Sequence, residues 1–146
     1  MKLLITPSRP RKSICAPPSK SFAHRALICA ALSERECTVK LTSVSQDIEA
    51  TLRCMAALGA SWERTDKSTL CVTGIGGKRK PFPELPHFDC GESGSTLRFF
   101  IPLALDGRGP GRLIGHGRLM QRPLTVYQSL FAPLDVVWRQ AGDALT

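Results

Sequence analysis

Two hydrophobic patterns alternate along this chain. Short apolar runs between polar or turn residues predict strands, and longer segments that open at a serine predict helices. In the first half these patterns predict strands over 2–6, 14–16 and 38–41, helices from Ser19 or Ser21 to about Leu32 and from Ser43 or Ser45 to just before Gly59, and a hairpin of 61–65 with 69–73.

The same patterns predict which helix faces are buried. The segment 26–32 is apolar on all sides, so we expect this part of the first helix to be buried all round. In the second helix the apolar stripe consists of Ile48, Leu52, Met55 and Ala56.

The second half repeats this order about 75 residues later, which indicates two copies of a β-α-β-α-β-β unit. The segments WER at 62–64 and VWR at 137–139 align at this offset. We expect the second copy to stop inside its final strand. Its predicted elements are strands over 87–90, 112–115 and 135–139, a strand that begins at 144, and helices over 93–105 and 123–131.

Composition narrows the class of protein. Hydrophobic residues make up 42% of the chain, enough for a packed core. No apolar run approaches the length of a membrane span and no export signal is recognisable, so we expect a soluble, cytoplasmic protein. The six cysteines form no C-x-x-C pair, which disfavours a zinc ribbon or a thioredoxin-type site. We expect cysteines in apolar runs, such as Cys29, to be small buried hydrophobes.

The net charge of +8 is compatible with nucleic acid, with anionic metabolites, or with a chain whose acidic part is absent. Aromatic residues are only 6% and the basic residues are scattered, which argues against nucleic acid. The one dense basic run, 78–80, is predicted to be a solvated loop. His24, His87 and His116 lack ligand spacing, so we expect no metal site.

Three segments could bind anions. The first, 18–25 (PSKSFAHR), places Lys20 at a helix start, with Ser21 and Arg25 on one face. The second, 89–98 (DCGESGSTLR), sets two glycines before a helix, where backbone amides can form an anion-binding nest. The third, 115–124 (GHGRLMQRPL), carries Arg118 and Arg122. Taken singly, the first segment fits ordinary helix capping slightly better than an anion site, the second is a weak signal that a tight turn also explains, and the third is a basic loop.

Taken in order, the three segments resemble the 5-enolpyruvylshikimate-3-phosphate (EPSP) synthase family. The resemblance rests on P-x-S-K-S-x-x-x-R at 17–25, on SQD at 45–47, on GESGSTLR at 91–98, and on G-x-x-R-L-M-x-R-P at 115–123. It implies an α/β fold of β-α-β-α-β-β repeats with buried helices, here one full unit and most of a second. It also implies transfer of the enolpyruvyl group of phosphoenolpyruvate to the 5-hydroxyl of shikimate 3-phosphate, a step toward chorismate and the aromatic amino acids.

The resemblance further implies a domain division. Residues 1–13 would be the first strand and hinge of the other domain, and 14–146 an incomplete substrate-binding domain with units at about 14–80 and 85–146. The family needs no metal or organic cofactor. Its general base and the substrate residues of the opposite domain have no counterpart here. We therefore expect this chain alone to be inactive, to require the remaining part of such an enzyme, and otherwise to self-associate.

Residue by residue, the resemblance implies a catalytic pair, Lys20 and Arg122. Lys20 would touch both substrates, and Ser21 and Arg25 would bind shikimate 3-phosphate. Gly94 would pack against phosphoenolpyruvate, whose charge Arg122 would clamp. Two departures concern local shape, because Glu92 stands where many members have Asn and Phe99 where many have Pro.

Two other functions stay open at this point. One is a non-catalytic fragment that binds phosphate or another anion. The other is a basic nucleic-acid-binding module related to the RNA 3′-phosphate cyclases, which share the repeat unit. Steep loss of RNA affinity with salt would favour the second, whereas the scattered charge and the Ser-Lys-Ser pattern argue against it. We expect no membrane partner.

Overall fold

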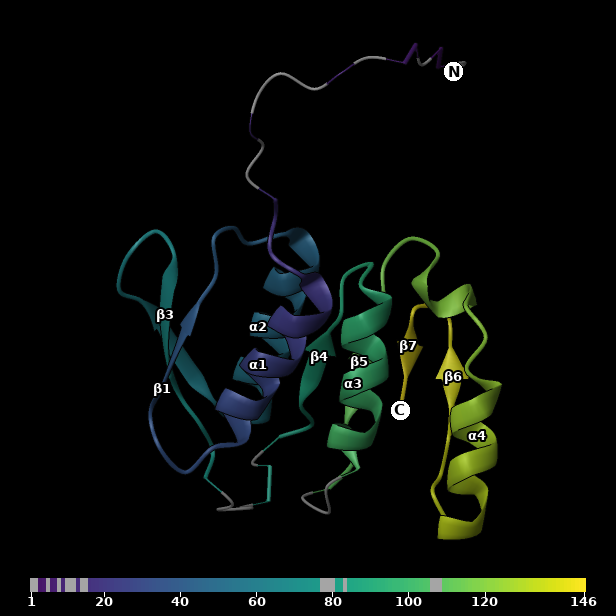
Figure 1. Ribbon diagram of the computed structural model, residues 1–146. Coiled ribbons are helices and arrows are strands. Elements are labelled where there is room, and N and C mark those ends of the chain that lie inside the picture. The colour runs from purple at the N-terminus through teal and green to yellow at the C-terminus, as the bar shows by residue number, and fades with distance from the viewer. Residues whose placement is uncertain are drawn as a thin grey trace.

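The structure, a computed structural model, describes residues 3, 4, 6, 7, 9, 13, 16–76, 81, 82, 84–105 and 109–146. Helices and strands follow one another along the chain, and each of the two repeats ends in a pair of consecutive strands (Figure 1). The elements are α1 (Lys20–Leu32), β1 (Cys37–Lys40), α2 (Gln46–Leu58), β2 (Ser61–Arg64), β3 (Thr69–Thr73), β4 (His87–Asp89), α3 (Gly94–Ala104), β5 (Arg112–Ile114), η1 (Leu119–Gln121), α4 (Thr125–Phe131), η2 (Ala132–Leu134), β6 (Gln140–Ala141) and β7 (Ala144–Leu145).

The strand order confirms the internal repeat. One sheet has the order β1-β3-β2 and the other β4-β5-β7-β6, so β5, β7 and β6 take the positions of β1, β3 and β2. In both sheets the last two strands form an antiparallel hairpin, and the later strand of that hairpin lies inside the sheet. Among the described residues, no strand of the first unit corresponds to β4. Residues 14 and 15 of the predicted strand over 14–16 lie outside the described residues, as does the basic run 78–80.

Two helix starts and one helix end follow the predicted capping signals, whereas Ser45, the residue before α2, makes no side-chain capping bond. Ser19 caps α1 by accepting a hydrogen bond from the amide of Phe22, and Ser93 caps α3 in the same way. Helix α2 ends at Gly59, whose φ of +105° is a left-handed conformation that glycine adopts without strain. The predicted strand over 2–6 includes residues 2 and 5, which lie outside the described residues; Leu3, Leu4 and Thr6 form no strand.

The core lies between the helices and the sheets. Helix α2 packs against α1, α3 and β4. The largest fully buried side chains include Phe88, Phe100, Leu27, Met55 and Leu70. Burial of such side chains supplies most of the stabilising free energy, at roughly 25 cal/mol per Å² of apolar surface. No helix among the described residues is long and apolar enough to cross a membrane.

Three sequence expectations about burial and strands are wrong. Helix α1 buries only one face, so Cys29 and Leu32 are exposed on the outer face with Phe22. Ala56 is also exposed, because the buried face of α2 turns toward Thr51, Cys54 and Leu58, where α1, α3 and β4 meet it.

The third wrong expectation is the strand over 135–139. Asp135 adopts a left-handed φ of +53° at the end of η2, and the residues after it run without a partner strand. Pairing starts only at Arg139, which exchanges backbone hydrogen bonds with Thr146. The strand is therefore β6, which begins one residue later and pairs with β7.

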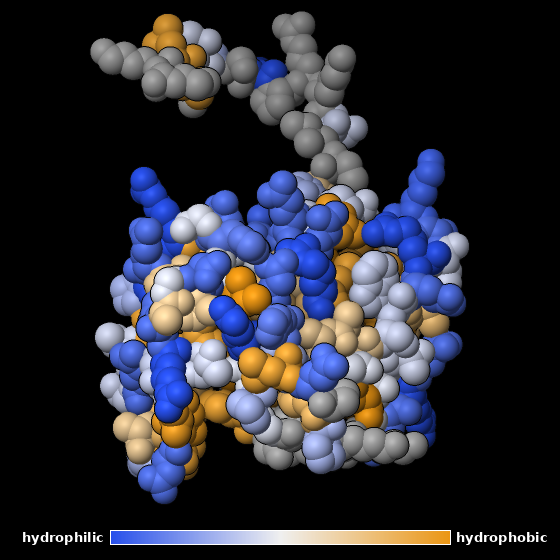
Figure 2. Space-filling view, turned by 180° about the vertical axis from the view of Figure 1, so that it is seen from behind, coloured by the Kyte–Doolittle hydropathy of each residue, from blue (hydrophilic) through white to orange (hydrophobic). Residues whose placement is uncertain are grey.

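An apolar surface accompanies this irregular segment. Val126, Leu130, Leu134 and Val137 are each at least 61% exposed. Figure 2 shows apolar side chains at the lower left edge, where α4 and the segment after it lie. Helix α4 has no fully buried residue, in contrast to α2 at the same position of the first unit.

Candidate active site

The N-terminal ends of α1, α2 and α3 lie together at one end of the molecule (Figure 1). Each end presents backbone N–H groups that have no helical partner and favour anions. The segment 115–122 reaches the same end, because the amide of His116 donates to the carbonyl of Gly91, 2.7 Å away, just before α3. The three sequence motifs are thereby brought to one place.

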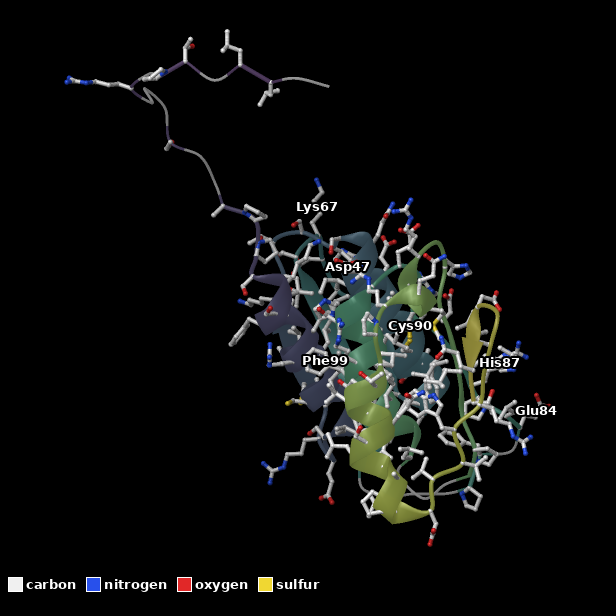
Figure 3. All side chains as sticks on the ribbon, turned by 90° about the vertical axis from the view of Figure 1, so that its right-hand side faces the viewer. Asp47, Lys67, Glu84, His87, Cys90 and Phe99 are labelled. Carbon is white, nitrogen blue, oxygen red and sulfur yellow. The ribbon has the colours of Figure 1, made fainter. Side chains whose placement is uncertain are left out.

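Helix α1 presents Lys20 in its first turn. The ammonium Nζ lies 2.8 Å from Oδ2 of Asp47, in the first turn of α2. Figure 3 shows Asp47 near the upper end of the helices. The Lys20 side chain is 61% exposed, and an ion pair so exposed to water is weak. Asp47 therefore positions the ammonium, but the pair is weak enough for Lys20 to leave Asp47 and contact a bound anion instead.

The guanidinium of Arg25 is held by two contacts. Its Nη1 donates to the backbone carbonyl of Ser21, one turn earlier, at 2.8 Å. Its Cζ lies 5.1 Å from the ring centre of Phe99 on α3, a cation–π distance. Ser21 and Arg25 share one face of α1, as their spacing predicts. Phe99 thus supports the guanidinium.

Gly94 and Arg122 are in close contact. A Cβ added at Gly94 would collide with Nη1 of Arg122 and would lie 3.1 Å from Nη1 of Arg98. Arg98 also donates to the carbonyl of Gly94 at 3.4 Å. Among the described residues, neither guanidinium is paired with a carboxylate. The first turn of α3 therefore combines two positive charges, a helix N-terminus and a backbone without a side chain.

A buried chain of hydrogen bonds joins the three helix ends beneath these charges. Nδ1 of His24 lies 2.7 Å from Oγ1 of Thr51, which lies 2.8 Å from Oγ1 of Thr96. Oγ1 of Thr96 lies 2.8 Å from Oγ of Ser93, the cap of α3. Both threonine hydroxyls also lie 3.3 Å from the backbone carbonyl of Asp47. Because all four side chains are at most 3% exposed, each depends on these partners, and the network fixes the helix ends relative to one another.

We expect acid to weaken this network through His24. Burial, reinforced by the charges of Lys20 and Arg25, holds the pKa of His24 below its ordinary value of 6.5, although Asp47 acts in the opposite direction. Between the folded pKa and 6.5 the unfolded chain binds more protons, so stability rises with pH in that window and is independent of this group above it. Urea unfolding should show the free energy of unfolding falling below pH 6.5, by at most about 1.4 kcal/mol per pH unit.

A His24→Asn variant is the control for this titration. Compared with the wild-type chain, it should lack this part of the pH dependence, because asparagine does not ionise in this range. The same slope in both proteins between pH 5 and 7 would contradict the assignment to His24.

A polar cavity of about 550 Å³ lies beside α2 at the same end. The carboxylate of Asp89 lies 3.0 Å from Nε of Arg53 and 3.0 Å from Nε2 of His116. Burial opposes its charge, but the amide of Gly91, Arg53 and His116 together hold the pKa of Asp89 below its usual range. This cluster ties the segment 115–122 to α2. The cavity is lined by Gln46, Asp47, Glu49, Arg53, Gly91, Glu92 and His116.

Cys54 and Cys90 have a structural role. Cys54 and Cys90 are buried with their Sγ atoms 4.0 Å apart, and Figure 3 shows Cys90 inside the fold. The hydrogen bond between the two thiols and their burial raise the pKa of Cys54, which disfavours a reactive thiolate. No group of three or more potential metal ligands of the Cys, His, Asp or Glu type occurs in the part of the chain that the structure describes.

All five predicted site residues lie at this end of the molecule. Gly94 and Arg122 contact each other, whereas Lys20, Ser21 and Arg25 lie on α1, which the buried network joins to α2 and α3 through His24, Thr51 and Thr96. Sequence reasoning did not identify Asp47 as the partner of Lys20, nor the roles of Thr51 and Thr96. The sequence did contain one signal for Thr51 and Thr96: each lies inside a predicted helix among apolar residues, where a buried hydroxyl needs a hydrogen-bond partner. The ligand roles of the five residues remain predictions.

Comparison with known proteins extends the resemblance over nearly the whole chain. The model of the family EPSP synthase (3-phosphoshikimate 1-carboxyvinyltransferase) matches residues 5–139. A 3-phosphoshikimate 1-carboxyvinyltransferase of Clostridium perfringens is 41% identical over 144 residues, which is 99% of this chain and 33% of that protein. One of Clostridioides difficile is 42% identical over 137 residues, covering 88% of this chain and 31% of the relative.

A solved structure shows the same fold. EPSP synthase from Acinetobacter baumannii superimposes with a TM-score of 0.68 at 20% identity, over 90% of this chain and 31% of that one. This chain thus spans about a third of the length of the relatives it matches. The α/β architecture of repeated units agrees with the one expected from the sequence. By the match of the family model over most of its length, the chain belongs to the EPSP synthase family.

Proposed function

We propose that this chain supplies one side of the site that transfers the enolpyruvyl group of phosphoenolpyruvate to the 5-hydroxyl of shikimate 3-phosphate. The observation that carries the proposal is that four groups lie at the end of the molecule where the N-termini of α1, α2 and α3 pack together: Lys20 and Arg25 on α1, Gly94 on α3, and Arg122, which contacts Gly94. Both substrates are anions, and cationic side chains at helix N-termini suit them. We also propose the cytoplasm, where soluble anionic metabolites occur, as the location.

Each substrate has its own group of residues in this proposal. Ser21 and Arg25 bind shikimate 3-phosphate, with Arg25 pre-oriented by the Ser21 carbonyl and by the ring beneath it. Gly94 and Arg122 bind phosphoenolpyruvate, because the missing side chain lets the ligand approach the backbone beside the guanidinium. Lys20, held over α2 by Asp47, contacts both substrates.

The reaction is addition followed by elimination. In the addition, the methylene carbon of phosphoenolpyruvate gains a proton, and the 5-hydroxyl oxygen forms a bond to C2 as it loses its own proton. In the elimination, the bond between C2 and the phosphate oxygen breaks, phosphate leaves, and the new methyl group returns a proton. The charge on the phosphate rises as it leaves, so fixed cations such as Lys20 and Arg122 stabilise that transition state more than the ground state.

In this proposal the two sides of the site come from two different domains of the enzyme. Residues 14–146 form part of a substrate-binding domain, and residues 1–13 belong to the other domain and its hinge. The general base and the opposite wall of the site come from the part of the enzyme that this chain does not include. The chain alone should therefore bind substrate anions without turning them over, and no metal or organic cofactor is needed.

Phosphate release tests this assignment. We expect no release from shikimate 3-phosphate and phosphoenolpyruvate with the chain alone, and release when it is mixed with the separately expressed remainder of a related enzyme. The remainder alone is the control. Release by the chain alone would contradict the need for an opposite wall. A silent mixture of two folded parts, with no binding of either substrate by calorimetry, would contradict the proposed function.

A further inference from the structure

Arg122 is held in place differently from the other proposed site residues. The others belong to the helices α1 and α3, whereas Arg122 follows directly on η1, a single turn of three residues. Figure 1 shows this segment between β5 and α4, at the end of the molecule where α1 and α3 begin. So short a turn is marginal by itself, because it contributes few hydrogen bonds of its own. The direction of the Arg122 guanidinium therefore depends on what holds the segment 115–122.

The start of this segment is tied to the turn after β4. The amide of His116 donates to the carbonyl of Gly91 at 2.7 Å, and its Nε2 lies 3.0 Å from Oδ1 of Asp89. The same carboxylate oxygen accepts the amide of Gly91 at 2.9 Å. The other oxygen, Oδ2, lies 3.0 Å from Nε of Arg53 on α2. The carboxylate of Asp89 thus joins the turn, α2 and the segment 115–122.

Two backbone hydrogen bonds lead from this anchor to Arg122. The carbonyl of His116 accepts the amide of Leu119 at 3.0 Å, and the carbonyl of Leu119 accepts the amide of Arg122 at 3.1 Å. The chain is tightly folded here, since a Cβ added at Gly115 would lie 2.8 Å from Sδ of Met120. The buried side chains of Leu119 and Met120 hold the middle of the segment, and His116 holds its start.

The contact between Arg122 and Gly94 requires an exact position of the segment. A Cβ added at Gly94 would collide with Nη1 of Arg122 and would lie 3.4 Å from its Cζ. The guanidinium therefore lies directly against the backbone at the start of α3. A shift toward α3 is blocked by that backbone, and a shift away would withdraw the positive charge from the helix N-terminus, where an anion is favoured.

We propose that Asp89 and His116 are positioning residues for enolpyruvyl transfer: they hold the start of the segment 115–122 and thereby keep the guanidinium of Arg122 against the backbone of Gly94. Asp89 acts through His116, and His116 acts through the backbone of the segment. This inference rests on the proposed function for the identity of the anion, phosphoenolpyruvate. The residues proposed for shikimate 3-phosphate lie on α1, so binding of that substrate should be independent of the pair.

The exposure of the pair makes it suitable for mutation. The side chains of His116 and Asp89 are 56% and 37% exposed, and an ion pair so exposed contributes little to stability. Removal of the imidazole should therefore change the orientation of the segment without unfolding the chain. The equal thermal stability of His116→Ala and the wild-type chain is the first check.

Steady-state phosphate release by the reconstituted enzyme tests the proposal. For His116→Ala we expect kcat/KM for phosphoenolpyruvate to fall roughly 10-fold and KM for shikimate 3-phosphate to stay within about twofold, because a small misplacement of a binding group is costly only for the substrate it contacts. His116→Gln should restore most of the loss, since its amide nitrogen can donate to Asp89. Asp89→Asn should cost less in the His116→Ala background than in the wild type.

The matched control is His87→Ala, which removes another exposed histidine, two residues before Asp89 on β4. It should leave the kinetic constants for both substrates unchanged. Amide hydrogen exchange reports on the anchor without catalysis. Exchange at Leu119 and Arg122 should be faster in His116→Ala than in His87→Ala, and should return to the wild-type rate in His116→Gln.

Two results would overturn the proposal. One is an equal kcat/KM for phosphoenolpyruvate in His116→Ala and His87→Ala. The other is a loss that affects KM for both substrates alike and that His116→Gln does not restore, which would show a general structural role. A wild-type mixture that releases no phosphate would instead contradict the proposed function. Hydrogen exchange at Leu119 and Arg122 would then still decide whether the pair holds the segment.

Discussion

The Lys20→Ala variant should lower the rate of phosphate release by the reconstituted enzyme roughly 100- to 1000-fold, the usual cost of removing one preorganised group that stabilises transition-state charge. Lys20 lies at a helix N-terminus and is positioned by Asp47 at 2.8 Å, so its ammonium is already placed before substrate binds. Because it is proposed to contact both substrates, kcat should fall together with kcat/KM. Steady-state kinetics with each substrate varied in turn measures both.

The matched control is Lys67→Ala, which removes another exposed lysine, located in the turn between β2 and β3. It should leave kcat and KM unchanged, which separates the specific role of Lys20 from a loss of net charge. Far-UV circular dichroism of both variants should match the wild-type chain, because the Lys20 ion pair is exposed. A Lys20→Ala enzyme with kcat within threefold of wild type would refute the catalytic role.

The Gly74→Ala variant should lose about 3 kcal/mol of stability, at the upper end of the usual cost of overpacking. An added Cβ would collide with the carbonyl of Ser33 and would lie 2.5 Å from that of Ala30 and 2.9 Å from that of Ala31. These are backbone atoms at the end of α1, so no rotamer change relieves the clash. The shift would also disturb the bond from the Ile75 amide to Ala31.

Urea unfolding followed by circular dichroism measures this loss, with Thr73→Ala as the neighbouring control. Thr73 is exposed at the end of β3, so its truncation should change the free energy of unfolding by no more than about 0.5 kcal/mol. If Gly74→Ala were as stable as Thr73→Ala, the tight contact between β3 and the end of α1 would be disproved.

Local signals in the sequence were sufficient for the elements that carry their own boundaries. Helix α1 begins after Ser19, α2 ends at Gly59, and the hairpin of β2 and β3 forms where its turn residues predict it. Capping serines, a left-handed glycine and alternating strands act within a few residues, so no distant contact is needed to place them. The order of elements also revealed the repeat that the two sheets confirm.

Burial and pairing depended on neighbours that are distant in sequence. Cys29 lies in an apolar run but faces outward, since α1 meets α2 on one side only. The segment 135–139 has strand-forming residues but no strand beside it, and the backbone pairs only from Arg139 onward. A hydrophobic pattern shows which side chains favour burial, whereas packing decides which of them find a partner.

The candidate site shows the same division. By itself the sequence determined the residue types, the three anion-binding motifs, the family resemblance and the repeat. Only the tertiary structure placed Asp47 beside Lys20, Arg122 against Gly94, and Thr51 between His24 and Thr96. The hydrogen-bonded pairs among these contacts join residues that are 27 to 45 positions apart in the sequence. They arise because three helices pack with their N-terminal ends together, and no local pattern encodes the distance between side chains on separate helices.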